Sequence, residues 1–293
     1  MLKFAPLGLL LLSGAAIAAP VSPPAVVIHQ FENLALSPDG ARTATVESDD
    51  PGNLADEPHG AVTVRDANGK MVAHYDPCSV CRYSGLAWSP KGDVLVFLGA
   101  DRKASKTTLY RVASGEPQSL TVISGVANTP RFSADGKRIA LLATIGARKM
   151  TGATEAAAAQ VGEIGASEDE QRISVLPATG GALKQVSPAD TYVYEFSWTP
   201  DGKGFAATAA KGNGDNNWWI ATLNYIDAAS GASRVIAAPK MQMNMPRVSP
   251  DGKSVAFIGG LMSDWGSVGG DVYTVALTGG APLDVTPGYK GTF

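Results

Sequence analysis

Three histidines, His29, His59 and His74, are the only imidazole side chains in this 293-residue chain. A serine hydrolase of the α/β type carries its nucleophile in a G-x-S-x-G turn, followed along the chain by an acid and then by a histidine. The sequence contains no G-x-S-x-G, and no histidine follows residue 74. We therefore expect no catalytic residues for peptide hydrolysis, and we interpret the histidines as ordinary strand-end or loop residues.

Cys78 and Cys81 are the two cysteines of the chain. The chain begins with a segment typical of export, and in exported proteins such a pair favours a disulfide, here closing a short loop with a small entropic gain. A zinc site with His74 is an alternative, although a fourth ligand is not evident. A redox-active pair and two free thiols also stay open, but no helix N-terminus nearby would activate the thiols. We expect the disulfide.

Asn213, Asp215 and Asn217 alternate oxygen-bearing side chains, a pattern that calcium sites also use. No glutamate stands at the twelfth position that a helix-loop-helix calcium site requires, and the intervening Gly214 and Asn216 suit a turn. We therefore expect a polar loop here, no metal site and no cofactor.

The first 18 residues have the features of a signal peptide. Lys3 gives the positively charged start, five leucines between residues 7 and 12 form the apolar centre, and Ala16 and Ala18 provide the small residues of a cleavage site. We place cleavage after Ala18, because Pro20 disfavours a cut directly before it. The apolar stretch is too short for a comfortable membrane span, which argues against a membrane anchor. A retained anchor stays open as the alternative. We expect a periplasmic or secreted protein that is free of the membrane in its mature form.

The composition indicates β structure. The chain has 33 glycines and 19 prolines, about 18% of its residues, against an average of about 12%. Charged residues are 17% and apolar residues 45%, which is enough to bury a core. The formal net charge is −3, which becomes −4 once Lys3 is removed, and no basic run is present. This charge pattern argues against nucleic acid and anionic membranes as partners.

A tetrapeptide of the Ser-Pro-Asp-Gly type recurs five times. Its copies are residues 37–40 (SPDG), 89–92 (SPKG), 133–136 (SADG), 199–202 (TPDG) and 249–252 (SPDG). Proline presets the first central position of a turn, and glycine supplies a left-handed conformation. Each copy therefore predicts a hairpin turn between two strands. The spacings of 52, 44, 66 and 50 residues leave room for a second strand pair after each turn.

Four strands repeated five times predict an all-β fold, a β-propeller of about five four-stranded blades. We place the blades, within a propeller domain of residues 19–293, at about residues 31–76, 83–122, 128–188, 193–238 and 244–287. A β-sandwich would not need one tetrapeptide at the same place in every unit. Trp88, Phe132 and Trp198 precede three of the turns and are expected to fill the gaps between blades.

Two of the predicted blades have local features of their own. The third blade carries an insertion at residues 145–171, in which an Ala-rich stretch predicts a short helix. In the fourth blade we expect the third strand at residues 219–227, because it begins with a tryptophan and continues with β-forming residues.

The repeats resemble those of TolB-like, WD-type propellers and those of the N-terminal propeller of the prolyl oligopeptidase family of serine peptidases. That family includes dipeptidyl aminopeptidases and acylaminoacyl peptidases. The resemblance to the peptidases is the closer one, since it also rests on the exported N-terminus and on residues 168–173, 187–195 and 212–219.

The resemblance implies a non-catalytic role. In the peptidase family a propeller of seven or eight blades precedes an α/β-hydrolase domain and restricts which peptides enter. With five blades counted, we expect an incomplete ring that lacks the hydrolase domain and is inactive alone, its partners being peptide substrates. Some relatives anchor a substrate's amino terminus with propeller carboxylates, which here would be Glu168 and Glu170; a solvated acidic loop is the alternative.

Two further functions stay open. A TolB-like propeller would act as a module that contacts a periplasmic protein. A five-bladed enzyme with an acidic or metal site in its channel would need ligands from several blades, and the expected inner-strand positions are mostly apolar.

Overall fold

The structure, a computed structural model, describes residues 27–50, 52, 58–147, 169–212, 215–261 and 269–293. Antiparallel strands make up nearly all the regular structure of these residues, together with one 3-10 helix, η1 (Asp215–Ile220). None of the described residues belongs to a helix long and apolar enough to cross a membrane. The expected signal peptide and the expected helix of the insertion lie outside the described residues.

Five blades of four strands follow one another along the chain. Blade 1 comprises β1 (Ile28–Leu36), β2 (Arg42–Asp50), β3 (Ala61–Asp66) and β4 (Met71–Tyr75). Blade 2 comprises β5 (Arg82–Trp88), β6 (Leu95–Asp101), β7 (Lys106–Val112) and the first half of β8 (Gln118–Phe132). Blade 3 comprises the second half of β8, β9 (Arg138–Ile145), β10 (Arg172–Pro177) and β11 (Lys184–Gln185).

The last two blades complete the series. Blade 4 comprises β12 (Thr191–Trp198), β13 (Gly204–Lys211), β14 (Thr222–Asp227) and β15 (Ser233–Ala237). Blade 5 comprises β16 (Gln242–Val248), β17 (Ser254–Gly260), β18 (Asp271–Ala276) and β19 (Leu283–Asp284). Within each blade every strand pairs with the next one in an antiparallel meander.

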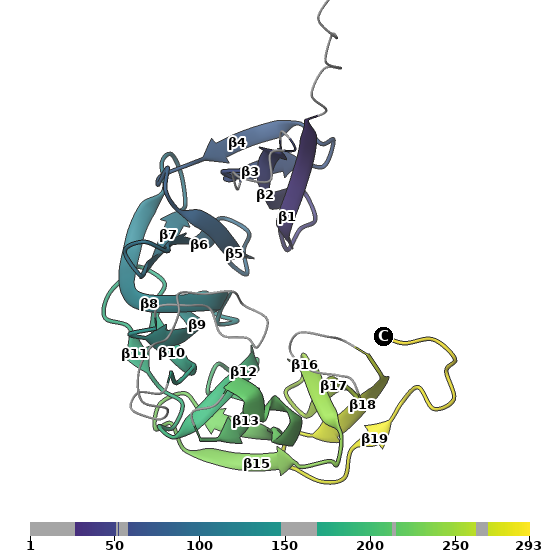
Figure 1. Ribbon diagram of the computed structural model, residues 1–293. Helices are drawn as coiled ribbons and strands as arrows, with labels where there is room; N and C mark the ends of the chain where they lie inside the picture. The colour runs from purple at the N-terminus through teal and green to yellow at the C-terminus, as the bar shows by residue number, and fades with distance from the viewer. Residues whose placement is uncertain (1–26, 51, 53–57, 148–168, 213–214, 262–268) are drawn as a thin grey trace, which may run out of the picture.

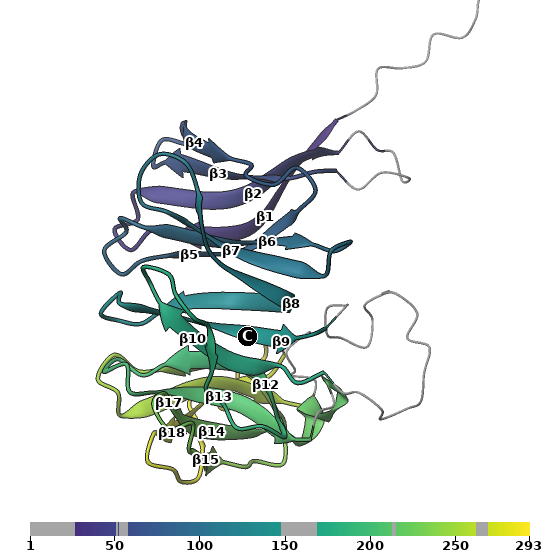
Figure 2. The same cartoon turned by 90° about the vertical axis from the view of Figure 1, so that its left-hand side faces the viewer.

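The blades are arranged around an open arc. Figure 1 shows them in order, from β1 (purple) at one end to β16–β19 (green to yellow) at the other. The first strand of each blade lies on the inner, concave side of the arc and the last strand on the outer side. Seen from the side, the blades stack as successive sheets (Figure 2). This arrangement is that of a β-propeller and confirms the predicted fold class.

Apolar side chains from the facing sheets of neighbouring blades form the core. Between blades 1 and 2, Val62 and Phe97 are both fully buried in one such cluster. Trp88, Phe132 and Trp198 each belong to a cluster between two blades, which confirms their predicted role. Burying one large apolar side chain contributes about 1.5–3 kcal/mol, so neighbouring blades stabilise one another by stacking.

Each tetrapeptide forms a tight turn between the first two strands of its blade, as predicted. In the first, Gly40 has a φ of 70° and its N–H donates to the carbonyl of Ser37 at 2.8 Å. The Ser37 hydroxyl donates to Asp39 at 2.6 Å and accepts the backbone N–H of Arg42 at 2.9 Å. The turns at residues 133–136, 199–202 and 249–252 repeat these bonds.

The turn at residues 89–92 reaches the same geometry with a different partner. Lys91 occupies the position that is aspartate in the other four turns. The Ser89 hydroxyl instead donates to Asp93 at 2.7 Å, and it accepts the N–H of Val94 at 3.1 Å. A carboxylate two residues further along therefore replaces the missing one.

Strand β8 belongs to two blades at once. Its first half pairs with β7 and its second half with β9. Gly125, where the pairing changes partner, has a φ of 132°, and a Cβ there would lie 2.2 Å from the carbonyl oxygen of Thr144. Only glycine fits at this position, because any side chain would collide with the backbone of β9.

The strand expected at residues 219–227 is shorter in the structure. Strand β14 begins at Thr222, and η1 occupies residues 215–220. Trp218 packs against the cluster that contains Tyr192 and Tyr194, while Trp219 is 60% exposed. The burial of one tryptophan in a helical turn therefore overrides the β propensity of the pair.

Candidate functional site

A groove of about 500 Å³ lies on the concave side of the arc. Its walls come from the first strands of blades 1 to 4, close to the turns that follow those strands. Apolar surface is supplied by Trp88, Pro130 and Trp198, and a charge by Arg131. A groove with apolar walls and one cation is suited to a small organic ligand or an extended peptide segment.

The inner strands that build the groove all carry a bulge. Their register with the second strand shifts by one residue in every blade. In four blades the shifted residue has a left-handed backbone: Asn33, Gly85, Thr129 and Met245. Because a bulge leaves a residue out of the ladder, it frees backbone groups for other partners. The repeated bulge is thus a feature of the concave face.

The side chain of Glu195 accepts a hydrogen bond from one of these freed backbone groups. It stands in β12 at the position that is left-handed in the other blades, four residues before the turn. Its Oε2 accepts the backbone N–H of Met245, the equivalent residue of blade 5, at 2.7 Å. Burial raises the pKa of the Glu195 carboxyl, and the Met245 N–H and the cations Arg247 and Arg131 act against that rise.

Arg131 and Arg247 lie on either side of Glu195, in blades 3 and 5. Each stands two residues before its turn, where the other three blades have Ala35, Ala87 and Ser197. The pKa of Arg131 is lowered by burial and, secondly, by the positive charge of Arg247. Three successive inner strands therefore carry a cation, an anion and a cation.

Arg131 is the member of this set that lines the groove. Its guanidinium carbon is 6.0 Å from the centroid of the Phe196 ring, and its Nε is buried without a hydrogen-bond partner among the described residues. Arg247 is exposed and donates from Nη1 to the carbonyl of Pro246 at 2.8 Å. An arginine that lines an open groove can bind an anionic ligand through its guanidinium.

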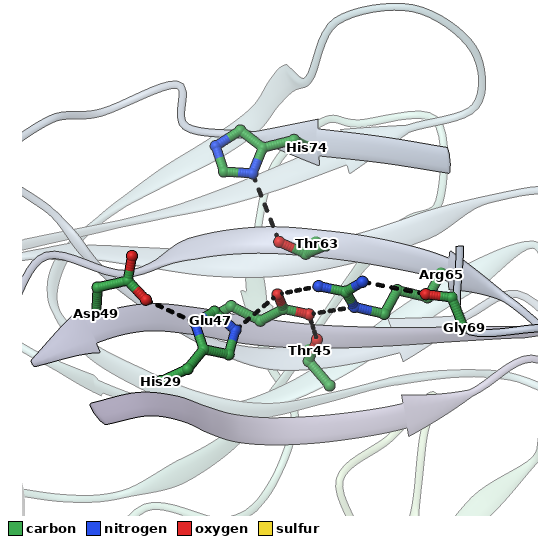
Figure 3. Close-up of polar contacts among 8 residues, drawn as sticks. All are labelled: His29, Thr45, Glu47, Asp49, Thr63, Arg65, Gly69 and His74. Carbon is green, nitrogen blue, oxygen red and sulfur yellow. Dashed lines mark hydrogen bonds and ion pairs between the residues drawn. The ribbon is translucent and has the colours of Figure 1, made fainter. Parts of the chain in front are cut away.

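A second polar cluster lies on the face of blade 1 that points away from blade 2 (Figure 3). At its centre is Glu47, which is buried and accepts bonds from Arg65 Nε at 2.9 Å and Nη2 at 2.7 Å. Thr45 donates to the same carboxylate at 2.7 Å, and His29 Nε2 lies 3.2 Å from it. The bonds from Arg65 hold the pKa of Glu47 down at about 2. These contacts satisfy the carboxylate, so the cluster is structural.

The three histidines lie in strands or beside them and contact acids or hydroxyls. His29 Nδ1 is 2.6 Å from Asp49, and His59 Nε2 is 3.0 Å from Asp76. His74, in β4, is 3.5 Å from the hydroxyl of Thr63. None of the three is hydrogen-bonded to a serine hydroxyl among the described residues, so the structure gives no nucleophile and base pair there.

Cys78 and Cys81 are joined by a disulfide in the connection between β4 and β5. The loop is also held by Tyr83, whose hydroxyl is 2.7 Å from the N–H of Cys78 and 2.8 Å from Asp76. Because the sulfurs are bonded to each other, no thiolate is available to join His74 in a zinc site.

Of the remaining candidates from the sequence, those that the structure describes are not brought together. Glu168 and Asn213 lie outside the described residues. Glu170 accepts the N–H of Asp190 at 2.9 Å, and Asn217 donates to the carbonyl of Lys211 at 3.2 Å. Among the residues that the structure does describe, no three His, Cys, Asp or Glu side chains are grouped to hold a metal ion.

The sequence carries a signal for the charges on the concave face. Once the five turns are aligned, the position two residues before each turn is Ala or Ser in three blades and arginine in two. A small residue fits a channel wall, whereas an arginine at the same position places a charge into the channel. Arg131 and Arg247 depart from the repeat in this way. Glu195 departs from it at the position four residues before the turn, where no other blade has a charged residue.

No protein-family model matches the chain. Solved structures with the same fold include a protein assigned as TolB from Agrobacterium tumefaciens (TM-score 0.57, 14% identity, covering 87% of this chain and 80% of that chain). A puromycin-hydrolyzing peptidase of Mycobacterium tuberculosis is also similar (TM-score 0.59, 14% identity, 88% of this chain and 37% of that chain). So is the hydrazine synthase of Kuenenia stuttgartiensis (TM-score 0.55, 17% identity, 93% of this chain and 70% of that chain).

The chain spans about half of the TolB of Acinetobacter baumannii (52%) and little more than a third of the Mycobacterium tuberculosis peptidase. At these levels of identity the similarity establishes the fold, a propeller of the kind found in TolB and in the peptidases. It does not establish an activity, because one fold carries many functions.

Proposed function

We propose that this propeller binds peptide segments on its concave face and limits which of them reach a hydrolase domain. The observation that carries the proposal is the groove of about 500 Å³ between the inner strands of four blades. The proposal makes the chain a non-catalytic part of a serine peptidase that is exported by its N-terminal segment.

The walls of the groove support a peptide as the ligand. The rings of Trp88 and Trp198 and the side chain of Pro130 offer apolar contacts for peptide side chains. The indole nitrogens are already occupied, since Trp88 donates to the carbonyl of Ala35 at 3.2 Å and Trp198 to that of Arg131 at 3.1 Å. The rings are therefore held in place by neighbouring blades before any ligand arrives, which reduces the entropy cost of binding.

The residues of this chain support a binding role over a catalytic one. The sequence has no G-x-S-x-G and no histidine after residue 74. The polar side chains that line the groove are Thr129, Arg131 and Ser197, which can recognise and orient a ligand. Cleavage of a bound peptide would then need a nucleophile from outside these 293 residues.

A second function, contact with a folded periplasmic protein, is favoured by one observation. TolB structures from two species, Agrobacterium tumefaciens and Acinetobacter baumannii, have the same propeller fold, and this chain matches 80% and 52% of their lengths. In this alternative the concave face would hold a loop or terminus of the partner, and no hydrolase domain would be involved.

Peptide binding is tested by fluorescence anisotropy with labelled peptides of about six residues and with the purified chain. Ala87→Trp fills the groove and should abolish binding, because Ala87 lines it. Ala134→Trp is the matched control: it adds the same side chain to an exposed turn and should leave binding unchanged. A chain that binds no peptide at millimolar concentration would rule out the proposal. A photo-crosslinker at residue 87 that captures a folded protein, without competition from peptides, would support the alternative.

A further inference from the structure

We propose that Arg131 and Arg247 together form a recognition site for a carboxylate of the bound peptide, either its C-terminal group or an Asp or Glu side chain. This inference rests on the proposed function, because it assumes that the groove holds a peptide. It assigns to the concave face a chemical preference that the apolar walls alone would not provide.

The two arginines stand at equivalent positions on the first strands of blades 3 and 5, on either side of blade 4. Arg131 belongs to β8 and Arg247 to β16, yet the charge of Arg247 acts on the Arg131 guanidinium. Their backbones flank the inner strand of blade 4: Trp198 Nε1 donates to the carbonyl of Arg131 at 3.1 Å, and the N–H of Val248, next to Arg247, donates to Ser197 Oγ at 3.3 Å. Both arginine strands lie on the concave side of the arc, where the first strands of the blades face one another (Figure 1). Two cations that approach each other in this way repel, and an anion between them removes the repulsion.

Arg131 has donors to spare. Its Nε is buried and makes no hydrogen bond among the described residues, and its contact with the Phe196 ring is a loose one at 6.0 Å. Burying an N–H group without a hydrogen bond is costly, whereas Arg131 as a whole is only partly buried and, because it lines the groove, can offer its guanidinium to a ligand. A carboxylate has two coplanar oxygens that match the fork of a guanidinium, so it is a suitable partner.

Glu195 sets the charge of the site. Its Oε2 is held by the N–H of Met245 at 2.7 Å, so the side chain is fixed between the two arginines and offsets one of them. One positive charge is then left over, in a chain whose formal net charge is −3. A singly charged carboxylate balances that charge, whereas a phosphate dianion would bring one negative charge too many. This charge count favours a carboxylate over a phosphate.

The test uses three versions of one labelled hexapeptide: a free C-terminal acid, a C-terminal amide, and an amide with one internal glutamate. We expect the wild-type chain to bind the free acid or the glutamate peptide at least about 10-fold more tightly than the plain amide. The peptide with the advantage identifies the source of the carboxylate. Equal binding of all three peptides would overturn the inference and leave the proposed function intact.

Variants locate the preference in the arginines. Arg131→Met and Arg247→Met should each remove most of the 10-fold advantage, and Glu195→Gln should increase it, since one negative charge is lost. Arg111→Met is the matched control, because Arg111 lies on β7 away from the groove and its Nε also lacks a hydrogen-bond partner among the described residues. Arg247 is exposed, so its variant should fold even if the Arg131 variant does not. An unchanged preference in a folded Arg247→Met chain would contradict the site, while failure of the wild type to bind any peptide would contradict the proposed function.

Discussion

The guanidinium of Arg138 lies over the ring of Trp198, with its central carbon 5.0 Å from the ring centroid. The same guanidinium donates to the carbonyl of Gly202, at the turn of the next blade, at 2.6 Å. Arg42 and Trp88 repeat this relationship between blades 1 and 2, at 4.7 Å. Two of the four joints between blades therefore have the same construction, in which an arginine that follows one turn covers the tryptophan that precedes the next.

The arginine–tryptophan joints should contribute to stability. Arg138→Met and Arg42→Met should each lower the free energy of unfolding by about 1–3 kcal/mol, because each removes a cation–π contact and a bond to a backbone carbonyl. Urea unfolding followed by tryptophan fluorescence measures the change. Lys137→Met, which removes a neighbouring exposed charge, should have little effect. Equal stability of Lys137→Met and Arg138→Met would show that the joint is not stabilising.

The hydroxyl of the first residue of each turn should contribute more to the stability of the chain than the identity of the other turn residues. Ser133→Ala should destabilise the chain by about 1–2 kcal/mol, because it removes bonds to Asp135 and to the N–H of Arg138 from a fully buried position. The turn of blade 2 tests whether Asp93 takes the place of the aspartate that the other four turns contain. Asp93→Ala should lower the urea midpoint, while Lys91→Ala should not; the reverse order would contradict the assignment of Asp93.

The Glu47 cluster should make the chain sensitive to acid. The pKa of Glu47 is about 2 in the folded chain against an ordinary value of 4.5, so its contribution is complete above pH 4.5 and is lost as the pH falls from 4.5 toward 2. The shift corresponds to about 2–3 kcal/mol once screening at the partly exposed Arg65 is allowed for. Urea unfolding at pH 6 and pH 3 measures the loss. Glu47→Gln should be less stable than the wild type at pH 6 and should lose less between the two pH values; identical slopes would contradict the prediction.

His29 should titrate above its ordinary pKa of 6.5. The hydrogen bond to Asp49, and secondly that to Glu47, raise the pKa of the imidazole. The stabilisation from the protonated ring is therefore present below pH 6.5 and lost as the pH rises through the raised value. An NMR titration of the ring should give a midpoint above 6.5, and Asp49→Asn should lower it. Asp50→Asn is the control, since Asp50 contacts Gln30 instead at 2.9 Å; a larger effect of Asp50→Asn would contradict the assignment.

The disulfide between Cys78 and Cys81 should contribute at the low end of the range for disulfides. It closes a loop with a sequence separation of 3, for which the loss of chain entropy in the unfolded state corresponds to about 2 kcal/mol. Cys78→Ser with Cys81→Ser should fold and lose about that amount, since the Tyr83 hydroxyl still holds the loop. Unfolding with and without a thiol reductant measures the loss, and the double variant should be insensitive to the reductant. Failure of the double variant to fold would contradict the prediction.

Much of the architecture could be predicted because its determinants are local. The turn residues from Ser37 to Gly40 specify a hairpin by their own backbone preferences and by hydrogen bonds that span five residues. Five such turns at similar spacing leave few folds other than a propeller. The helical turn η1 could not be predicted in this way, because Trp218 is placed by packing against Tyr192 and Tyr194, which are distant in sequence.

The candidate site could be predicted only in part, because it depends on contacts between blades. Glu195 meets the N–H of Met245 only because the bulges of blades 4 and 5 coincide in space. The Glu47 cluster likewise combines His29 of β1 with Arg65 of β3, and nothing in their spacing indicates that both would reach one carboxylate. The available signal for Arg131 was its charge at a position, two residues before the turn, where three of the other blades have alanine or serine.

The continuous strand β8 has a mechanical consequence. Blades 1 and 2, 3 and 4, and 4 and 5 are connected by loops, but blades 2 and 3 share one extended backbone that passes through Gly125. These two blades should move as a single rigid body, so widening of the arc to admit a large ligand must bend it at the other three connections. A residue inserted within β8 would alter the alignment of both sheets at once, which makes residues 118–132 the segment least tolerant of changes in length.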